Sequence, residues 1–303
     1  MASEGGNLGA MYNLAGCYAE GDGIEKDLVK AFEWYKRAAD GGQHDAAHCV
    51  GFCLVHGMGT EPSAEAAIGY LKRGAEHGVT EAQYELGLCY ADGVGVEKDV
   101  RAASVLFKKA GERGHPGALH GIGTCHLHGM GVKQDDDAAM RNFRKAAEAG
   151  HLEAQYDLAM GYAAGKGVKQ QWPEALRWLL RSAEGGHPAA QYSLGCRYAT
   201  GTGVKRSEKQ AVQWYRAAAN AGNAPAMTNL GFALAYGQGV AQNHAEAAEW
   251  FRCAMEAGVE NAKEYMEEAL KMAAQSSGRP ASSRGSRRMT DPSESPPVSP
   301  TVK

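Results

Sequence analysis

Residues 82–114 read AQYELGLCYADGVGVEKDVRAASVLFKKAGERG, and this stretch decides the fold. Leu86 and Tyr90 stand four positions apart, so they share one face of a helix. The Gly93–Gly95 motif then ends that helix, because glycine adopts a positive φ at little cost. Asp99 is an expected N-cap, and a second apolar stripe at helical spacing follows it. The stretch therefore predicts a helical hairpin.

The hairpin pattern returns every 36 residues without an insertion or a deletion. Two alanine columns and three glycine columns hold in all seven copies, and one of them is Ala10, Ala46, Ala82, Ala118, Ala154, Ala190 and Ala226. A single short hairpin cannot bury its apolar face, whereas stacked copies can. We therefore predict an all-α fold, a right-handed α-solenoid of seven 36-residue helix-turn-helix repeats followed by a C-terminal capping helix.

The repeat register sets the predicted boundaries. Repeats begin at residues 10, 46, 82, 118, 154, 190 and 226, and a partial, capping repeat begins at 262. Residues 1–9 resemble the end of a second helix, so they are interpreted as the remnant of a partial repeat. Residues 276–303 are rich in Ser, Pro and Arg, a composition typical of a disordered tail. The solenoid thus occupies residues 10–275.

Composition and charge exclude several classes of protein. The formal net charge of −3 argues against a dedicated binder of nucleic acid or of an anionic membrane. There is no run of about 18 apolar residues, so membrane insertion is not expected. The N-terminus lacks the pattern of a signal peptide, and the seven cysteines include no C-x-x-C pair. Reduced thiols and a cytoplasmic or nuclear location are therefore expected.

The repeat pattern A-x-Y-x-L-G-x-x-Y-x-x-G-x-G-V, followed by A-x-x-W-Y-x-x-A-A-x-x-G, resembles the Sel-1-like repeat, a subclass of the tetratricopeptide-type repeats. The closest copies to the pattern are the first, with Tyr12, Leu14, Tyr18, Trp34 and Tyr35, and the sixth, with Tyr192, Leu194, Gly195, Tyr198, Trp214 and Tyr215. The resemblance covers residues 10 to 258. It implies a non-enzymatic scaffold or adaptor, without a cofactor, that binds other proteins or peptides in signalling or protein quality control. It names no individual partner and no oligomeric state.

By analogy with tetratricopeptide arrays, the first helix of each hairpin lines the concave side of the solenoid. Two columns of these helices are the candidate binding residues, namely Tyr12, His48, Tyr84, His120, Tyr156 and Tyr192 in one, and Phe52, Leu88, Met160 and Phe232 in the other. Aromatic and methionine side chains on a curved groove suit the docking of a peptide or helix. The alternative for the first column is packing between adjacent repeats. The second column varies from copy to copy, and variation favours specific recognition.

A second hypothesis rests on a cysteine ladder. Cys17, Cys53, Cys89 and Cys125 occupy one position in four consecutive copies, and Glu20, His56, Asp92 and His128 follow three residues later. A thiol- or metal-dependent protein, either a redox sensor or a hydrolase-like binder, is the alternative function. However, stacked hairpins lie about 8–10 Å apart, whereas tetrahedral zinc needs ligands within about 2.0–2.3 Å of one ion. We therefore predict no metal site and no catalytic residues.

The tail carries three candidate phosphorylation sites. Thr290 follows Arg287 and Arg288, and Ser295 and Ser299 each precede a proline. Residues 276–303 hold four arginines and one lysine against one aspartate and one glutamate, a net charge of +3. Phosphate groups would invert this local charge.

Overall fold

The computed structural model describes residues 7–277, and in that range the chain forms fifteen α-helices and no β-strand. The helices are α1 (Leu8–Glu20), α2 (Leu28–Asp40), α3 (His44–His56), α4 (Ala64–Glu76), α5 (Thr80–Asp92), α6 (Val100–Glu112), α7 (Pro116–His128), α8 (Asp136–Glu148), α9 (Leu152–Ala164), α10 (Trp172–Glu184), α11 (Pro188–Thr200), α12 (Glu208–Asn220), α13 (Ala224–Tyr236), α14 (His244–Glu256) and α15 (Ala262–Ser277). The all-α solenoid expected from the repeat is confirmed.

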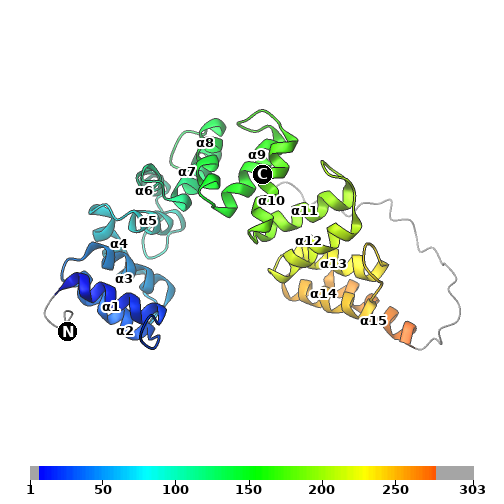
Figure 1. Cartoon of the computed structure of the whole chain (residues 1–303), viewed down its shortest axis with the longest axis horizontal. Helices are drawn as coiled ribbons and strands as arrows, with labels where there is room; N and C mark the ends of the chain where they lie inside the picture. The colour runs from blue at the N-terminus through cyan, green and yellow to red at the C-terminus, as the bar shows by residue number, and fades with distance from the viewer. Residues whose placement is uncertain (1–6, 278–303) are drawn as a thin grey trace.

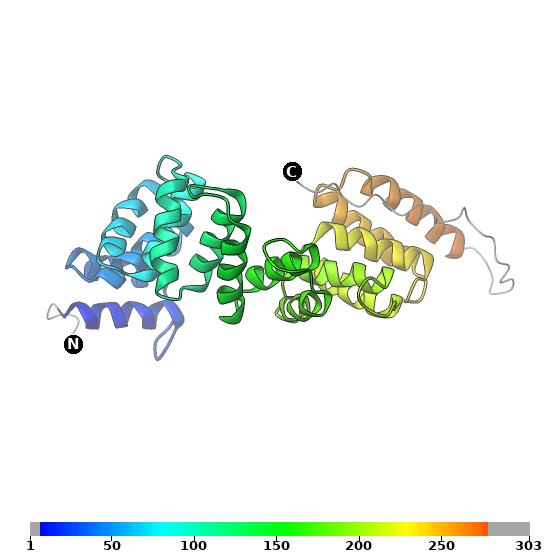
Figure 2. The ribbon, with the colours of Figure 1, turned by 90° about the horizontal axis from the view of Figure 1, so that it is seen from above.

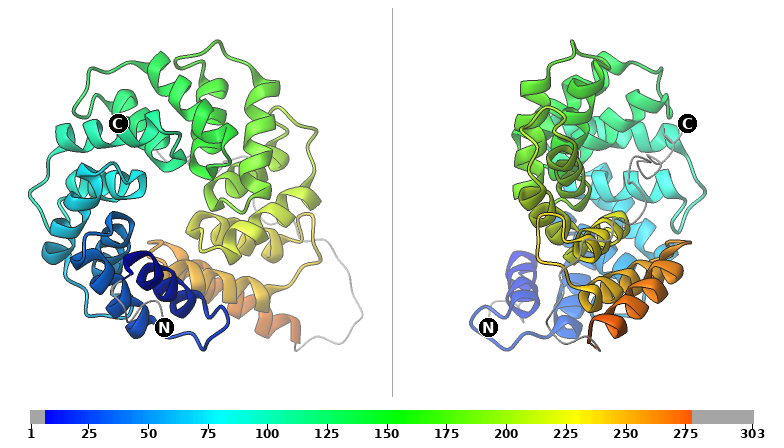
Figure 3. Two further views of the ribbon diagram at one scale, coloured as in Figure 1. Left: turned by 60° about the vertical axis from the view of Figure 1, so that its left-hand side comes forward. Right: turned by 90° about the vertical axis from the view of Figure 1, so that its right-hand side faces the viewer.

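The helices pair into seven hairpins that stack in chain order. The odd-numbered helices α1 to α13 are the first helices of the hairpins, and the even-numbered helices α2 to α14 are the second helices. Each helix packs against its partner in the hairpin and against the neighbouring hairpin. The stack follows an arch from α1 through α8 and α9 to α15 (Figure 1). Seen from above, α1 and α15 lie toward opposite ends of the molecule (Figure 2), and an oblique view shows the chain winding through most of a turn (Figure 3).

The two glycines of each G-x-G motif do different work. The first ends the first helix: Gly93 has a φ of 79°, and its N–H donates to the carbonyl of Cys89. The second allows a close approach: a Cβ on Gly131, whose φ is 70°, would collide with the carbonyl group of Val100 at the start of the preceding second helix. In five of the seven hairpins the loop therefore rests on the backbone of the hairpin before it, and the glycines concerned are Gly59, Gly95, Gly131, Gly167 and Gly239.

Buried alanines hold the helices close together. Ala46, Ala82, Ala118 and Ala154, at the repeat-defining alanine position, are all 0% exposed. Larger side chains such as Phe143 and Phe251 fill the space between the two helices of a hairpin. This alternation of small and large residues gives dense packing between successive hairpins.

The second helices begin largely as the sequence predicts. Asp27, Asp99 and Asp135 occupy the N-cap position, and each side chain accepts a hydrogen bond from a backbone N–H of the first turn. Ser63 occupies the same position, but its side chain makes no such bond.

Helix α15 stands where the partial, capping repeat is expected. Ala262 and Ala269 are buried against the preceding hairpin, whereas Leu270 is 50% exposed. Leu270 occupies a position that is buried in α3 and α13, where a second helix covers it. Within residues 7–277, α15 has no second helix of its own. None of the helices in this range is long and apolar enough to cross a bilayer.

Candidate functional site

The first helices form the inner side of the curved stack. Helices α3 and α5, the first helices of successive hairpins, contact each other directly as well as through α4. Side-chain contacts also connect other successive first helices. His120 Nε2 lies 2.8 Å from Asp157 Oδ2, and the hydroxyls of Tyr156 and Ser193 are 3.5 Å apart. The helices on the inside of a curve lie closest together, so these contacts place the first helices on the inner side. We call this surface the first-helix face.

The ten predicted binding residues all lie on this face and are all half-buried. The column that begins with Tyr12 packs between successive hairpins. The Tyr84 ring, for example, lies 6.0 Å from the ring of Phe107 in its own second helix and 4.4 Å from His115 of the next hairpin. The residues of this column therefore contribute to the stack and leave only part of their surface free.

The sequence did not predict the residues on the next first helix that contact this column. They stand one position further along the next first helix, and Asp157 and Ser193 are examples. The partners differ in chemistry from copy to copy, so no single residue type marked them. A search for polar residues one period plus one position after the tyrosine column would have found them.

The second column, Phe52, Leu88, Met160 and Phe232, leaves apolar surface on the same face. The Phe52 ring contacts His48 and His56, at centroid distances of 6.2 and 4.4 Å. Leu88 and Met160 pack partly against their local core clusters. The column thus supplies separate apolar spots at intervals of one repeat.

Charge is distributed unequally between the two sets of helices. The seven first helices contain no lysine and only one arginine, Arg197, whereas the seven second helices contain sixteen lysines and arginines. The first helices carry seven carboxylates, and these are Glu20, Asp45, Glu81, Glu85, Asp92, Glu153 and Asp157. Arg197 lies over the ring of Trp172, 4.9 Å from its centroid. The first-helix face is therefore acidic.

These carboxylates have no cationic partner from lysine or arginine. Within residues 7–277, every ion pair between a lysine or arginine and a carboxylate involves residues outside the first helices, such as Arg216 with Glu246. Asp157 and Glu153 are paired only with histidines. Burial raises the pKa of Glu85, a sign that its charge is poorly compensated. A cation brought by a partner would meet free carboxylates here.

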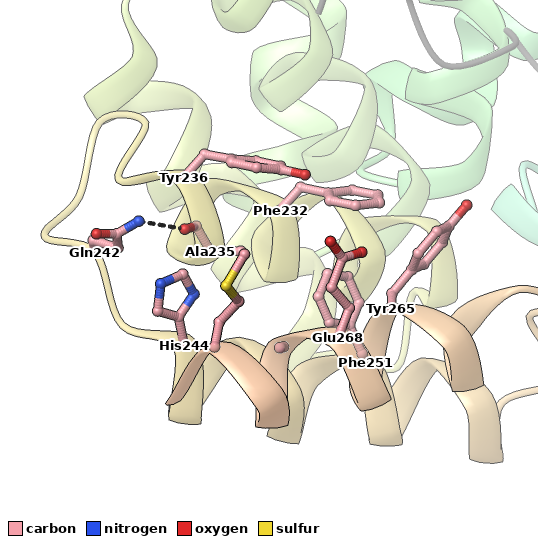
Figure 4. Close-up of a pocket in the computed structure, with 10 residues that line it drawn as sticks. Phe232, Ala235, Tyr236, Gln242, His244, Phe251, Tyr265 and Glu268 are labelled. Atoms are coloured by element: carbon pink, nitrogen blue, oxygen red, sulfur yellow. Dashed lines mark hydrogen bonds between the residues drawn. The ribbon is translucent and has the colours of Figure 1, made fainter. Parts of the chain in front are cut away.

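A pocket of about 130 Å³ lies at the C-terminal end of the first-helix face (Figure 4). It lies between α13, α14 and α15, and Phe232 from the predicted column is part of its wall. The rings of Phe232 and Tyr236 are nearly parallel, with an interplanar angle of 10° and a centroid distance of 6.2 Å. Tyr265 meets Phe232 edge-on at 4.8 Å. Glu268 and Met272 reach the pocket from α15.

Three histidines cap successive first helices. His115, His151 and His187 precede α7, α9 and α11, and the Nδ1 atom of each accepts a hydrogen bond from a backbone N–H of the first turn. Burial lowers the pKa of each of these histidines. Protonation of Nδ1 would remove the acceptor, so these caps need the neutral ring.

Three of the four cysteines of the ladder lie in the core, and Cys17 is half-buried. Cys53, Cys89 and Cys125 are 8%, 4% and 3% exposed. Burial raises the pKa of the Cys89 thiol to about 11, so the reactive thiolate is disfavoured. In the part of the chain that the structure describes, no three His, Cys, Asp or Glu side chains are arranged to hold a metal ion, and all seven cysteines are unpaired. These observations favour a packing role for the ladder.

The candidate phosphorylation sites Thr290, Ser295 and Ser299 lie outside the described residues, as does most of the tail predicted at 276–303.

Comparison with known proteins gives a consistent result. The family model described as Sel1 repeat matches seven consecutive segments, 9–43, 44–79, 80–115, 116–151, 152–187, 188–223 and 224–259. A Sel1 repeat protein from Oxalobacter formigenes is 30% identical with a TM-score of 0.74, and the alignment covers 88% of this chain and 77% of that one. A protective antigen of uropathogenic Escherichia coli strains, displaying an SLR fold, is 28% identical with a TM-score of 0.68. That alignment covers 91% of this chain but only 62% of the antigen. No curated protein matches the chain.

Proposed function

Because the chain belongs to the Sel1 repeat family, whose members generally mediate protein–protein interactions, we propose that it is a non-enzymatic scaffold that binds partner proteins or peptides along the first-helix face. The observation that carries this proposal is the segregation of charge described above. Seven carboxylates without a lysine or arginine partner lie on the same face as the apolar column. A face that was only exposed to solvent would not need unpaired carboxylates beside apolar side chains.

The face selects a partner by its chemistry. A segment that carries lysines or arginines together with apolar side chains would place its cations near Glu81, Glu85 and Asp157 and its apolar groups on Leu88 and Met160. Each exposed ion pair contributes at most about 1 kcal/mol, so the carboxylates mainly set specificity and association rate. The apolar contacts supply most of the affinity. The cellular setting that we propose is the assembly of signalling or quality-control complexes in the cytoplasm or nucleus.

One repeat supplies a matched test of the apolar contact. Leu88 lies on α5, the first helix of the third hairpin, and Val105 lies on α6, its second helix, where it is 53% exposed. We expect peptides selected on the wild-type chain from a random library to be enriched in basic and apolar residues. Leu88→Gln should weaken their binding at least tenfold, and Val105→Gln should leave it unchanged. Equal binding to both variants would show that the first-helix face is not the binding surface.

A second pair tests the charge. Glu81 is exposed on α5, and Glu112 is exposed at the end of α6. Glu81→Lys and Glu112→Lys change the net charge equally, but only the first changes the first-helix face. The expected result is weaker binding and a smaller salt dependence for Glu81→Lys alone. If both variants lose the same affinity, general electrostatic attraction and not the face decides the binding.

A further inference from the structure

The pocket at the C-terminal end of the first-helix face lies beside the partial, capping repeat. Helix α15 occupies the place of a first helix, and within residues 7–277 no second helix follows it. Tyr236 is 56% exposed and forms one wall, while Phe251 of α14 lies deeper, 5.1 Å from the ring of Phe232. The pocket is therefore an open space with aromatic walls, large enough for one long side chain.

Two polar groups of the pocket lack partners, whereas Gln242 donates to the carbonyl of Ala235. Glu268 is exposed at its edge, and its carboxylate makes no ion pair or hydrogen bond with the other residues of 7–277. The Nδ1 atom of His244 is buried and has no hydrogen-bond partner. A carboxylate beside aromatic ring faces suits a guanidinium group, which stacks on rings and donates two hydrogen bonds to a carboxylate. The chemistry of the pocket is thus that of an arginine site.

The chain itself offers arginines close to this site. The segment that follows α15 contains Arg279, Arg284, Arg287 and Arg288. The pocket residue Met272 stands five positions before the end of α15, a distance of about 7.5 Å along the helix. The seven residues that follow Ser277, up to Arg284, span up to about 23 Å when extended. The segment is long enough to turn back and place an arginine in the pocket.

Charge favours the same occupant. Residues 256–272, from the end of α14 to Met272 in α15, contain five glutamates and two lysines, whereas residues 276–303 have a net charge of +3. A tethered segment also competes at an effective concentration in the millimolar range, which compensates for a weak intrinsic affinity.

We propose that the pocket of Phe232, Tyr236, Tyr265 and Glu268 binds an arginine of the chain's own segment 278–288. This inference rests on the proposed function, because the bound segment covers the end of the first-helix face and competes with a basic partner there. The guanidinium stacks on the Tyr236 ring and pairs with Glu268. Phosphorylation at Thr290, two positions after the segment, would place negative charge beside Arg287 and Arg288 and release the segment from the pocket.

The test follows the Met272 methyl group by NMR in the full-length chain, with Met272→Leu to assign its resonance. The probe is a synthetic peptide of residues 278–291, added to a full-length chain in which the four arginines are replaced by glutamine. A saturable shift of the Met272 resonance is expected. Glu268→Gln or Tyr236→Ala in the same chain should weaken the binding at least tenfold. Leu270→Gln, on α15 but outside the pocket, should leave it unchanged.

Occupancy within the chain is tested by the same peptide on the wild-type protein. The tethered segment should reduce the apparent affinity of the peptide at least tenfold relative to the chain without tail arginines. Equal affinity for the two chains overturns the proposal, as does the absence of a saturable shift at Met272. The Leu88→Gln and Val105→Gln comparison does not involve this pocket, so a failure of the proposed function would be seen separately.

Discussion

The second glycine of the G-x-G motif allows the stacking of hairpins to be tested with an internal control. Gly131 and Gly203 occupy the same position in two different repeats, with φ values of 70° and 76°. A Cβ on Gly131 would collide with the Val100 carbonyl, whereas a Cβ on Gly203 would meet only the Trp172 ring, at 3.7 Å. Alanine at the two sites therefore imposes the same backbone strain but only one collision.

The expected magnitudes follow from these two terms. A left-handed conformation costs a non-glycine residue roughly 1–2 kcal/mol, and both variants lose this amount. Overpacking costs roughly 1–3 kcal/mol more, and the Val100 carbonyl belongs to the backbone, so it cannot rotate away. We expect Gly203→Ala to destabilise the chain by about 1–2 kcal/mol and Gly131→Ala by about 2–5 kcal/mol.

Urea unfolding followed by circular dichroism at 222 nm measures the difference. The unfolding of a repeat protein can be partly independent from one hairpin to the next, so hydrogen exchange at the start of α6 should accompany it. Gly131→Ala should raise the exchange rate there, and Gly203→Ala should not. An equal loss of stability in both variants would refute the reasoning, because the loop would then not rest on the preceding hairpin.

Further predictions concern the histidine caps and the thiols. Burial lowers the pKa of His115, His151 and His187 in the folded chain, so the unfolded chain takes up protons first as the pH falls below about 6.5. The stability that depends on the neutral caps should therefore be complete above about pH 6.5 and decrease as the pH falls below that value. Replacing all three by asparagine, the residue at the equivalent N-caps Asn7 and Asn223, should flatten this dependence, and an unchanged slope in urea titrations would contradict the role of the caps. The buried thiols of Cys53, Cys89 and Cys125 should react with a thiol reagent at pH 8 far more slowly in the native chain than in urea, and fast labelling of the native chain would contradict their burial.

The repeat length and the glycine and alanine columns determine the fold class because they are local and periodic. A helix ends at Gly93 whatever its neighbours are, and an alanine every 36 residues marks a close contact in every copy. That the ten candidate residues lie on one face was also predictable, since residues in register must share one face. The sequence did not predict which of these residues pack between hairpins and which leave surface exposed. That the Tyr84 ring packs against the next hairpin depends on the distance between hairpins, which no single repeat encodes.

By itself, the sequence determined the number of hairpins and the family. These depend on the short-range spacing of glycine and alanine residues, which recurs in every repeat. Only the tertiary structure decided which carboxylates lack a cation, which cysteines are buried, and that Phe232, Tyr236 and Glu268 meet in one pocket. Tyr236 and Glu268 are 32 positions apart, and they approach each other because α15 packs against α14 and beside α13. Contacts between repeats depend on the curvature of the helical stack and on where the stack stops. The periodic pattern of the sequence specifies neither.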